Sequence, residues 1–171
     1  MNSGRMDKMN LPPGAHIPGP MAEIELAWLY EQARKMTSII EIGSLRGRST
    51  FALLSGCPGP VHAVDIWESE AVYKDFIGNM AQFPNLVVHR SDSIRAASEL
   101  PDAEMIFIDR TPHEYEDVSA DIRAWEPKAM KLICGHDYAP QYPGVIRAVK
   151  EYFGPLDPVV NSIWYKFKNP K

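Results

Sequence analysis

Three side chains that can bind a metal ion or exchange a proton follow two short apolar segments of the sequence. Asp109 comes directly after the apolar segment 105–108, and His136 and Asp137 follow the segment 131–134. Two carboxylates and an imidazole nitrogen suit a divalent cation such as magnesium or a similar ion. Such an ion would bind a hydroxyl group and lower its pKa, which prepares the oxygen for nucleophilic attack. The residue types therefore indicate a metal site if the two segments end side by side.

His113 is a second candidate for chemistry, four residues after Asp109. The ordinary pKa of histidine, near 6.5, suits a general base that takes a proton from a hydroxyl group. A histidine in this place could equally be a residue that only caps the start of a helix or lines a site. The sequence leaves both interpretations open.

A glycine-containing segment, EIGSLRGRST at 41–50, follows the first apolar run of the chain. Gly43 and Gly47 allow the backbone to turn tightly and to approach a ligand. Asp65 ends the next apolar run, 22 residues after Gly43, where an acidic side chain can accept hydrogen bonds from ribose hydroxyls. This combination fits a nicotinamide dinucleotide or S-adenosylmethionine, because both contain a ribose.

The glycine spacing separates these two ligands. A dinucleotide site needs Gly-x-Gly-x-x-Gly to seat a pyrophosphate at a helix N-terminus, whereas this chain has Glu-x-Gly-x-x-x-Gly from Glu41 to Gly47. An acidic residue here disfavours a diphosphate and favours the sulfonium and ammonium groups of S-adenosylmethionine. The chain also lacks the Tyr-x-x-x-Lys pair of a nicotinamide-dependent oxidoreductase. S-adenosylmethionine is thus the expected ligand.

Short apolar runs alternate with longer stretches of helical period, which is typical of a parallel sheet covered by helices on both faces. The region 105–108 is almost entirely apolar and predicts a central strand buried on both sides. The last two runs are too close together for a helix between them and predict an antiparallel hairpin. The expected strands lie at 39–42, 61–65, 86–89, 105–108, 131–134, 158–160 and 162–167.

Length and composition place the chain among globular proteins of one domain. It has 171 residues, of which 45% are hydrophobic and 23% charged, with a net charge of −4, so the basic surface of a nucleic-acid-binding protein is not expected. Cys57 and Cys134 alone cannot make a disulfide framework, and no apolar run is long enough to cross a membrane. We expect a cytoplasmic protein with an irregular arm over 1–20 and one domain over 21–171.

The ordered series of motifs resembles a class I S-adenosylmethionine-dependent methyltransferase, and within that class it is similar to the small, stand-alone macrocin O-methyltransferases. The likeness runs from about residue 20 to the end of the chain. It implies a single-domain α/β fold, a three-layer αβα sandwich with a Rossmann-like, seven-stranded mixed sheet of order 3-2-1-4-5-7-6, strand 7 being antiparallel. The motifs are EIGSLRGRST at 41–50, VDIW at 64–67, SDS at 91–93, FID at 107–109, HEYE at 113–116 and GHDY at 135–138.

The resemblance also implies a role for each motif residue. Glu41, Gly43 and Ser44 would hold the methionyl end of the cofactor, and Asp65 would hold its ribose. Gly47 and Asp109 complete the cofactor-binding set, and Asp109 and His113 form the catalytic set. The adenine would lie between Ile66 and Trp67 on one side and Asp92 and Ser93 on the other, although the segment 91–93 taken alone also fits an ordinary helix N-cap.

The expected activity is methyl transfer to a hydroxyl group of a small molecule, such as a sugar or a secondary metabolite. Relatives that resemble catechol O-methyltransferase place acidic and amide metal ligands where this chain has His136 and Asp137. The loop after Asp109 is one residue longer than members of the branch commonly have, and it lacks their glycine and second acid. This favours an alternative, a non-catalytic module that binds S-adenosylmethionine or a partner. The N-terminal helix and terminal hairpin further predict a dimer or larger homo-oligomer.

Overall fold

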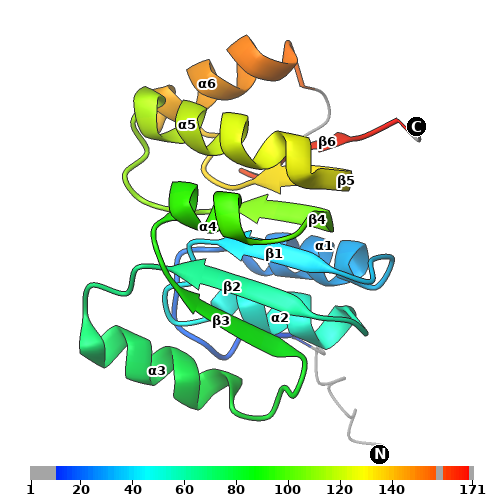
Figure 1. The fold of residues 1–171 in the computed structure, drawn as a ribbon, viewed down its shortest axis with the longest axis vertical. Helices are drawn as coiled ribbons and strands as arrows, with labels where there is room; N and C mark the ends of the chain where they lie inside the picture. Colours follow the sequence, from blue (N-terminus) through cyan, green and yellow to red (C-terminus); the bar gives the residue numbers. More distant parts are fainter. Residues whose placement is uncertain (1–10, 157–159, 170–171) are drawn as a thin grey trace, which may run out of the picture.

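A computed structural model describes residues 11–156 and 160–169 of the chain (Figure 1). Six strands and six α-helices alternate along most of this length, and a short 3₁₀ turn at Glu126–Lys128 precedes the fifth strand. The strands are β1 (Ile39–Ile42), β2 (Val61–Asp65), β3 (Leu86–Arg90), β4 (Ala103–Ile108), β5 (Ala129–Gly135) and β6 (Trp164–Phe167). The helices are α1 (Glu23–Ala33), α2 (Arg48–Gly56), α3 (Glu70–Met80), α4 (Ser93–Glu99), α5 (Tyr115–Trp125) and α6 (Pro143–Phe153).

The strands form one mixed sheet in the order β3-β2-β1-β4-β5-β6. The first five strands are parallel, and β6 runs antiparallel beside β5. The chain order reverses between β1 and β4, which is where ligands bind in open sheets of this kind. The predicted α/β fold class, the Rossmann-like order of the first five strands and the antiparallel last strand are confirmed.

The predicted number of seven strands is wrong for the part of the chain that the structure describes, where the sheet has six. Of the expected strand at 158–160, residues 158 and 159 lie outside the described residues, and Val160 forms only an isolated bridge with Ile163. The next strand begins at Trp164 rather than at Ser162, because the backbone N–H of Ser162 donates to the Glu25 carboxylate, at 2.9 Å, instead of joining the sheet.

Alternate side chains of the buried strand β1 point to opposite faces of the sheet and enter two different cores. Ile39 joins the core beneath α1, α2 and α3, whereas Ile40 and Ile42 join the core beneath α4, α5 and α6. Figure 1 shows α4, α5 and α6 in front of the sheet, with α1 and α2 behind it. Glu41 points toward α2 with Ile39, and this places a carboxyl group under the loop at 43–47 between β1 and α2, which we call the first loop.

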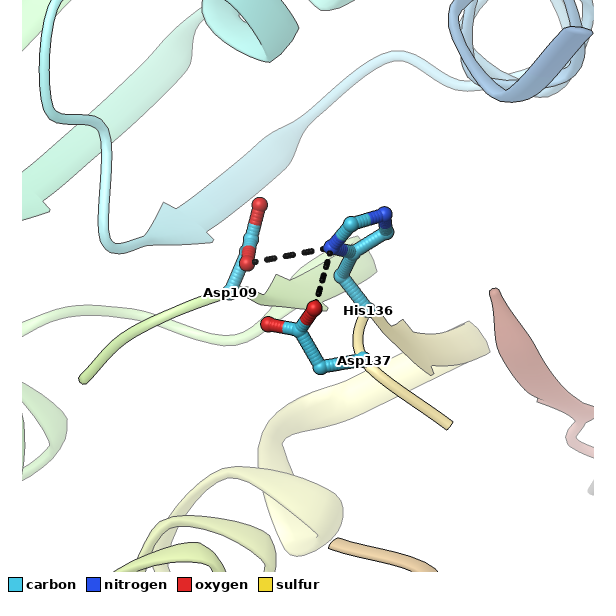
Figure 2. A group of neighbouring side chains, drawn as sticks. All are labelled: Asp109, His136 and Asp137. Carbon is cyan, nitrogen blue, oxygen red and sulfur yellow. Dashed lines mark ion pairs between the residues drawn. The ribbon is translucent and has the colours of Figure 1, made fainter. Parts of the chain in front are cut away.

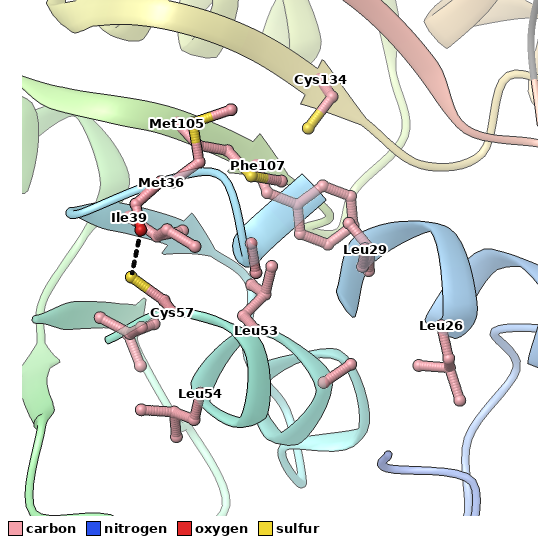
Figure 3. Packing of buried hydrophobic residues seen from close by; sticks show 14 of the residues in the cluster. Leu26, Leu29, Met36, Ile39, Leu53, Leu54, Cys57, Met105, Phe107 and Cys134 are labelled. Atoms are coloured by element: carbon pink, nitrogen blue, oxygen red, sulfur yellow. Dashed lines mark hydrogen bonds between the residues drawn. The ribbon is translucent and has the colours of Figure 1, made fainter. Parts of the chain in front are cut away.

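Hydrophobic side chains fill both cores, and Figure 3 shows part of the core beneath α1, α2 and α3. Trp125 and Trp164 are fully buried, whereas Trp28 is only partly buried against the core beneath α1, α2 and α3. The free thiol of Cys57 lies 3.4 Å from the carbonyl oxygen of Met36, and both cysteines are buried without a disulfide. Within the described ranges, no helix has the length and apolar character that crossing a membrane requires.

Candidate functional site

A cavity of about 650 Å³ lies at the carboxyl ends of β1, β2 and β4. This volume is within the range of small-molecule sites, roughly 300–1,000 Å³. Most residues predicted for the cofactor or for chemistry line it, while Glu41, Gly47, Asp92 and His136 do not. The predicted residues in its wall are Gly43, Ser44, Asp65, Ile66, Trp67, Ser93, Asp109, His113 and Asp137.

Asp65 organises the loops on both sides of the cavity. One carboxylate oxygen accepts hydrogen bonds from the backbone N–H groups of Ser44, at 3.0 Å, and Leu45, at 2.9 Å. The other accepts from the N–H of Trp67, at 2.8 Å. Leu45 and Trp67 have positive φ angles of 48° and 41°, a strained conformation that these bonds help to hold. The carboxylate still lines the cavity and has acceptor capacity left for ligand hydroxyls.

Gly43 is required by the close approach of β1 to β4. Its φ is 88°, and a Cβ atom at this position would lie 2.0 Å from the carbonyl oxygen of Asp109. A side chain would therefore separate the first loop from Asp109. The glycine keeps these two parts of the cavity wall in contact.

Glu41 is completely buried and lies beneath the cavity wall rather than in it. Its carboxyl group accepts hydrogen bonds from Ser44 Oγ at 2.7 Å, Ser49 Oγ at 2.5 Å and the hydroxyl of Thr50. Burial raises the pKa of Glu41 to about 7, although these hydroxyl bonds act in the opposite direction. In this structure Glu41 ties the first loop to the start of α2.

The raised pKa of Glu41 predicts a pH-dependent loss of stability. The folded protein binds the Glu41 proton up to about pH 7, whereas the ordinary value of 4.5 applies to the unfolded chain. The Glu41 contribution to the free energy of unfolding should therefore fall by about 3 kcal/mol as the pH rises through this window. Urea denaturation between pH 4.5 and 8 measures it. The isosteric Glu41→Gln variant should lack this component, and an unchanged pH slope in that variant would contradict the assignment.

The two residues predicted to flank the adenine occupy different environments. Trp67 is only 2% exposed, donates its indole N–H to the carbonyl oxygen of Leu45 at 2.8 Å, and packs on Phe76. Ile66 is 46% exposed and lines the cavity directly. Trp67 therefore supports the wall of the site, and Ile66 offers the apolar contact surface.

The segment after β3 fits the N-cap interpretation more closely than the adenine-binding one. Asp92 accepts hydrogen bonds from the backbone N–H of Ile94, at 2.9 Å, and of Arg95, at 3.3 Å, at the start of α4. The hydroxyl of Ser93 donates to Asp121 at 2.5 Å and accepts from the indole of Trp125 at 2.8 Å. Both side chains are thus engaged within the protein.

Ser91 and Arg110 line the cavity close to this segment, and neither was predicted as a cofactor-binding residue. Arg110 is held by Asp121, at 2.5 Å, and by Asp117, at 3.5 Å. The sequence gives no signal for this pairing beyond the presence of acids on the next helix.

His136 lies among three carboxylates, and the two that follow β4 and β5, Asp109 and Asp137, are drawn with it in Figure 2. Its Nδ1 atom is 3.1 Å from Asp137 Oδ1 and 3.5 Å from Asp109 Oδ1, and its Nε2 atom is 3.1 Å from Glu25 Oε2. Burial acts to lower the pKa of His136, but hydrogen bonds to the three carboxylates outweigh it and raise the pKa to about 12. The predicted convergence of Asp109, His136 and Asp137 is present, with one ligand atom of each within 4.8 Å of the others.

His113 reaches the same group of residues from the long loop after β4. Its Nε2 atom is 2.7 Å from Asp137 Oδ2, and its ring packs on Tyr142 with a centroid distance of 4.3 Å. His136 and His113 together outweigh the effect of burial on Asp137 and hold the pKa of its carboxyl group below the ordinary value. The loop of unusual length thus still brings His113 to the cavity, next to a carboxylate that orients it.

One wall of the cavity comes from the N-terminal segment, which the sequence indicates only as an irregular arm. Residues 18–21 line the cavity. Arg48, at the start of α2, holds this segment by donating to the carbonyl oxygens of Met21 at 2.9 Å, Ala15 at 2.8 Å and Ile17. Among the described residues no carboxylate pairs with Arg48, so backbone carbonyls alone fix its guanidinium group.

Comparison with known proteins identifies both a sequence family and a fold. Residues 40–138 match the family model of a methyltransferase domain. No curated protein matches the sequence. The fold is shared with an O-methyltransferase from Bacillus cereus solved with SAH, which is 19% identical over 93% of this chain and 85% of that one, with a TM-score of 0.66.

Two further structures have the same fold. The cofactor-bound protein Rv0187 from MTB is 15% identical over 89% of this chain and 83% of that one, with a TM-score of 0.71. The O-methyltransferase TomG from Streptomyces achromogenes, solved with SAM, is 13% identical over 88% and 82% of the two chains, with a TM-score of 0.68. Because the sequence identities are low, these structural likenesses establish the fold alone.

Proposed function

The chain belongs to the methyltransferase-domain family of class I S-adenosylmethionine-dependent methyltransferases, and on this basis we propose that it transfers a methyl group from S-adenosylmethionine to a hydroxyl group of a small molecule. The observation that carries the proposal is the cavity at the switch point of the sheet, which has Asp65 at one end and the pair of His113 and Asp137 at the other. The first end supplies hydroxyl acceptors for a ribose. The second supplies a base beside the expected acceptor.

The residues of the cavity suit a cationic methyl donor. Asp65, Asp109 and Asp137 all line it, so a sulfonium and an ammonium group would meet carboxylates. We assign the ribose to Asp65 and the methionyl end to the loop at Gly43 and Ser44, whose backbone approaches Asp109. The adenine would pack on Ile66. This arrangement directs the methyl group toward Asp109 and His113.

In the transfer itself, the acceptor oxygen forms a bond to the methyl carbon as the carbon–sulfur bond breaks, and S-adenosylhomocysteine leaves. Much of the rate of such a step comes from holding the oxygen in line with the methyl group. His113 takes the hydroxyl proton, and Asp137 fixes the orientation of its ring from 2.7 Å. An acceptor hydroxyl would therefore lie between His113 and Asp109.

A divalent cation such as magnesium is the second component of the proposal. Asp109, Asp137 and Nδ1 of His136 would hold it, and the bond from His136 Nε2 to Glu25 matches the carboxylate contact that metal-bound histidines usually make. The ion would replace the proton that His136 shares with the two aspartates. When bound, it would polarise the acceptor hydroxyl.

We expect removal of this ion to slow the reaction without preventing cofactor binding. Dialysis against EDTA should lower kcat, and added magnesium should restore it, because the ion acts on the acceptor and not on the ribose or adenine. Steady-state kinetics gives kcat, and calorimetry gives the affinity for S-adenosylmethionine in both states. Equal kcat values with EDTA and with magnesium would remove the metal from the proposal.

Calorimetry with S-adenosylmethionine and S-adenosylhomocysteine tests the proposed function most directly. We expect dissociation constants well below the millimolar range for both. Transfer of a labelled methyl group is then measured over a panel of hydroxylated sugars and secondary metabolites, with and without magnesium. Failure to bind either compound would overturn the proposal, and binding without transfer to any acceptor would favour the non-catalytic module.

A further inference from the structure

Glu25 is a buried carboxylate outside the cavity whose hydrogen bonds connect distant parts of the chain. It lies in the first turn of α1 and is only 1% exposed. One oxygen accepts from the N–H of Ala22 at 2.7 Å, and the other accepts from Asn161 Nδ2 at 2.9 Å and from the N–H and hydroxyl of Ser162 at 2.9 and 2.7 Å. These bonds, with that of His136, outweigh the effect of burial and lower the pKa of Glu25 to about 2.

The contact of Glu25 with His136 continues to the cavity through two further close ion-pair contacts. His136 Nε2 lies 3.1 Å from Glu25, and its Nδ1 atom lies 3.1 Å from Asp137 Oδ1. The second oxygen of Asp137 lies 2.7 Å from Nε2 of His113. Glu25, His136, Asp137 and His113 thus form one continuous row from the interior to the cavity, which we call the carboxylate–histidine row.

Two features connect the orientation of this row to its buried end. Asp137 has a φ of 62°, an unfavourable conformation for a residue with a Cβ atom, and its side chain turns back toward the neighbouring ring of His136. His136 can meet Asp109 and Asp137 through Nδ1 only while its other nitrogen faces away from them. Glu25 and the Ser162 hydroxyl, 3.0 Å from Nε2, hold that nitrogen in place.

We propose that Glu25 is a positioning residue for methyl transfer, which acts through His136 to orient Asp137 and His113 toward the acceptor. This inference rests on the proposed function. Glu25 itself touches neither cofactor nor acceptor, and its role is the same whether a proton or a metal ion lies at Nδ1 of His136. Loss of its charge would free the imidazole ring to rotate and so loosen both aspartate contacts.

Kinetics of the Glu25→Gln variant distinguishes positioning from simple stabilisation. We expect kcat to fall about 10- to 100-fold, the usual cost of losing a partner that orients a ligand or a base. The KM for S-adenosylmethionine should stay within about twofold of the wild type, because Asp65 and the first loop are unchanged. Glu104→Gln is the matched control. Glu104 forms a salt bridge with Lys131 at 2.7 Å and accepts a hydrogen bond from the N–H of Thr37 at 2.8 Å. Both contacts lie outside the cavity, so the kcat of the Glu104→Gln variant should equal that of the wild type.

Histidine side-chain NMR provides a readout that does not need activity. In the wild type we expect a downfield, slowly exchanging Nε2–H signal from His136. In Glu25→Gln this signal should shift and the ring signals of His113 should shift with it, while Glu104→Gln leaves both in place. If the wild type transfers no methyl group, the proposed function fails, but these shifts still test the positioning. Absence of the His136 signal in the wild type, or unchanged His113 signals in folded Glu25→Gln, would overturn the proposal.

Discussion

Substituting alanine for Asp65 is expected to reduce the affinity for S-adenosylmethionine by at least about 100-fold. Each hydrogen bond to a charged group contributes about 1.5–3 kcal/mol, and two ribose hydroxyls would lose their acceptor. The variant also leaves the N–H groups of Ser44, Leu45 and Trp67 without their partner, so both loops lose the geometry that the ligand requires. Calorimetric titration of the variant with S-adenosylhomocysteine measures the loss.

Asp102→Ala is the control for this experiment. Asp102 is an exposed acid that pairs with Lys128 at 3.3 Å, and it does not line the cavity. Its removal lowers the net negative charge by the same amount without changing the two loops. A dissociation constant for Asp65→Ala within about fivefold of the control would rule out Asp65 as the ribose acceptor.

The second large effect is expected from His113→Gln. Removing a general base typically lowers the rate by about 10²- to 10⁴-fold. We expect a fall of this size in kcat, with an unchanged dissociation constant for the cofactor, because His113 lies at the end of the cavity away from Asp65. Single-turnover measurements with saturating S-adenosylmethionine isolate the transfer step from product release.

His89→Gln serves as the comparison for His113→Gln. His89 lies on β3, pairs with His62 at 2.9 Å, and does not line the cavity, so this variant should keep the wild-type rate. If His113→Gln also keeps the wild-type rate, His113 only lines the site. Proton removal would then fall to Asp109 or to solvent.

The strands of the sheet could be predicted because each one contains a short, mainly apolar run. Strand β4 is the clearest case, since its last four residues are apolar and buried and the observed strand includes all of the predicted one. The end of the chain was harder to predict. The run at 162–167 has the alternation of a strand, but the contacts of Ser162 with Glu25 depend on a residue 137 positions earlier.

The candidate site shows the same division between local and distant information. Asp65, Asp109, His113 and Asp137 could be found because strand ends in a parallel sheet meet at one edge. The burial of Glu41 could not be found, because its partners become visible only when α2 packs under the first loop. Glu25 gave no signal either. It reads as an ordinary acid in the first turn of a helix, and its role depends on contacts made across the whole fold.

Arg48 holds the segment 14–21 through hydrogen bonds that we call the clasp. This kind of contact leaves parts of the segment free to change in sequence. Among the described residues, Arg48 donates its side-chain hydrogen bonds only to main-chain carbonyl oxygens, which every amino acid possesses. Only Gly14 and Gly19 are tied to the clasp by their own identity, since a Cβ atom there would lie 2.2 and 2.9 Å from atoms of Arg48. Ile17 and Met21 are held by burial in the core, but mutations at the exposed Pro18 and Pro20 could alter the chemistry of the cavity wall while the course of the segment is inherited intact. New acceptors would become accessible in evolution without rebuilding the half of the site that we assign to the methyl donor.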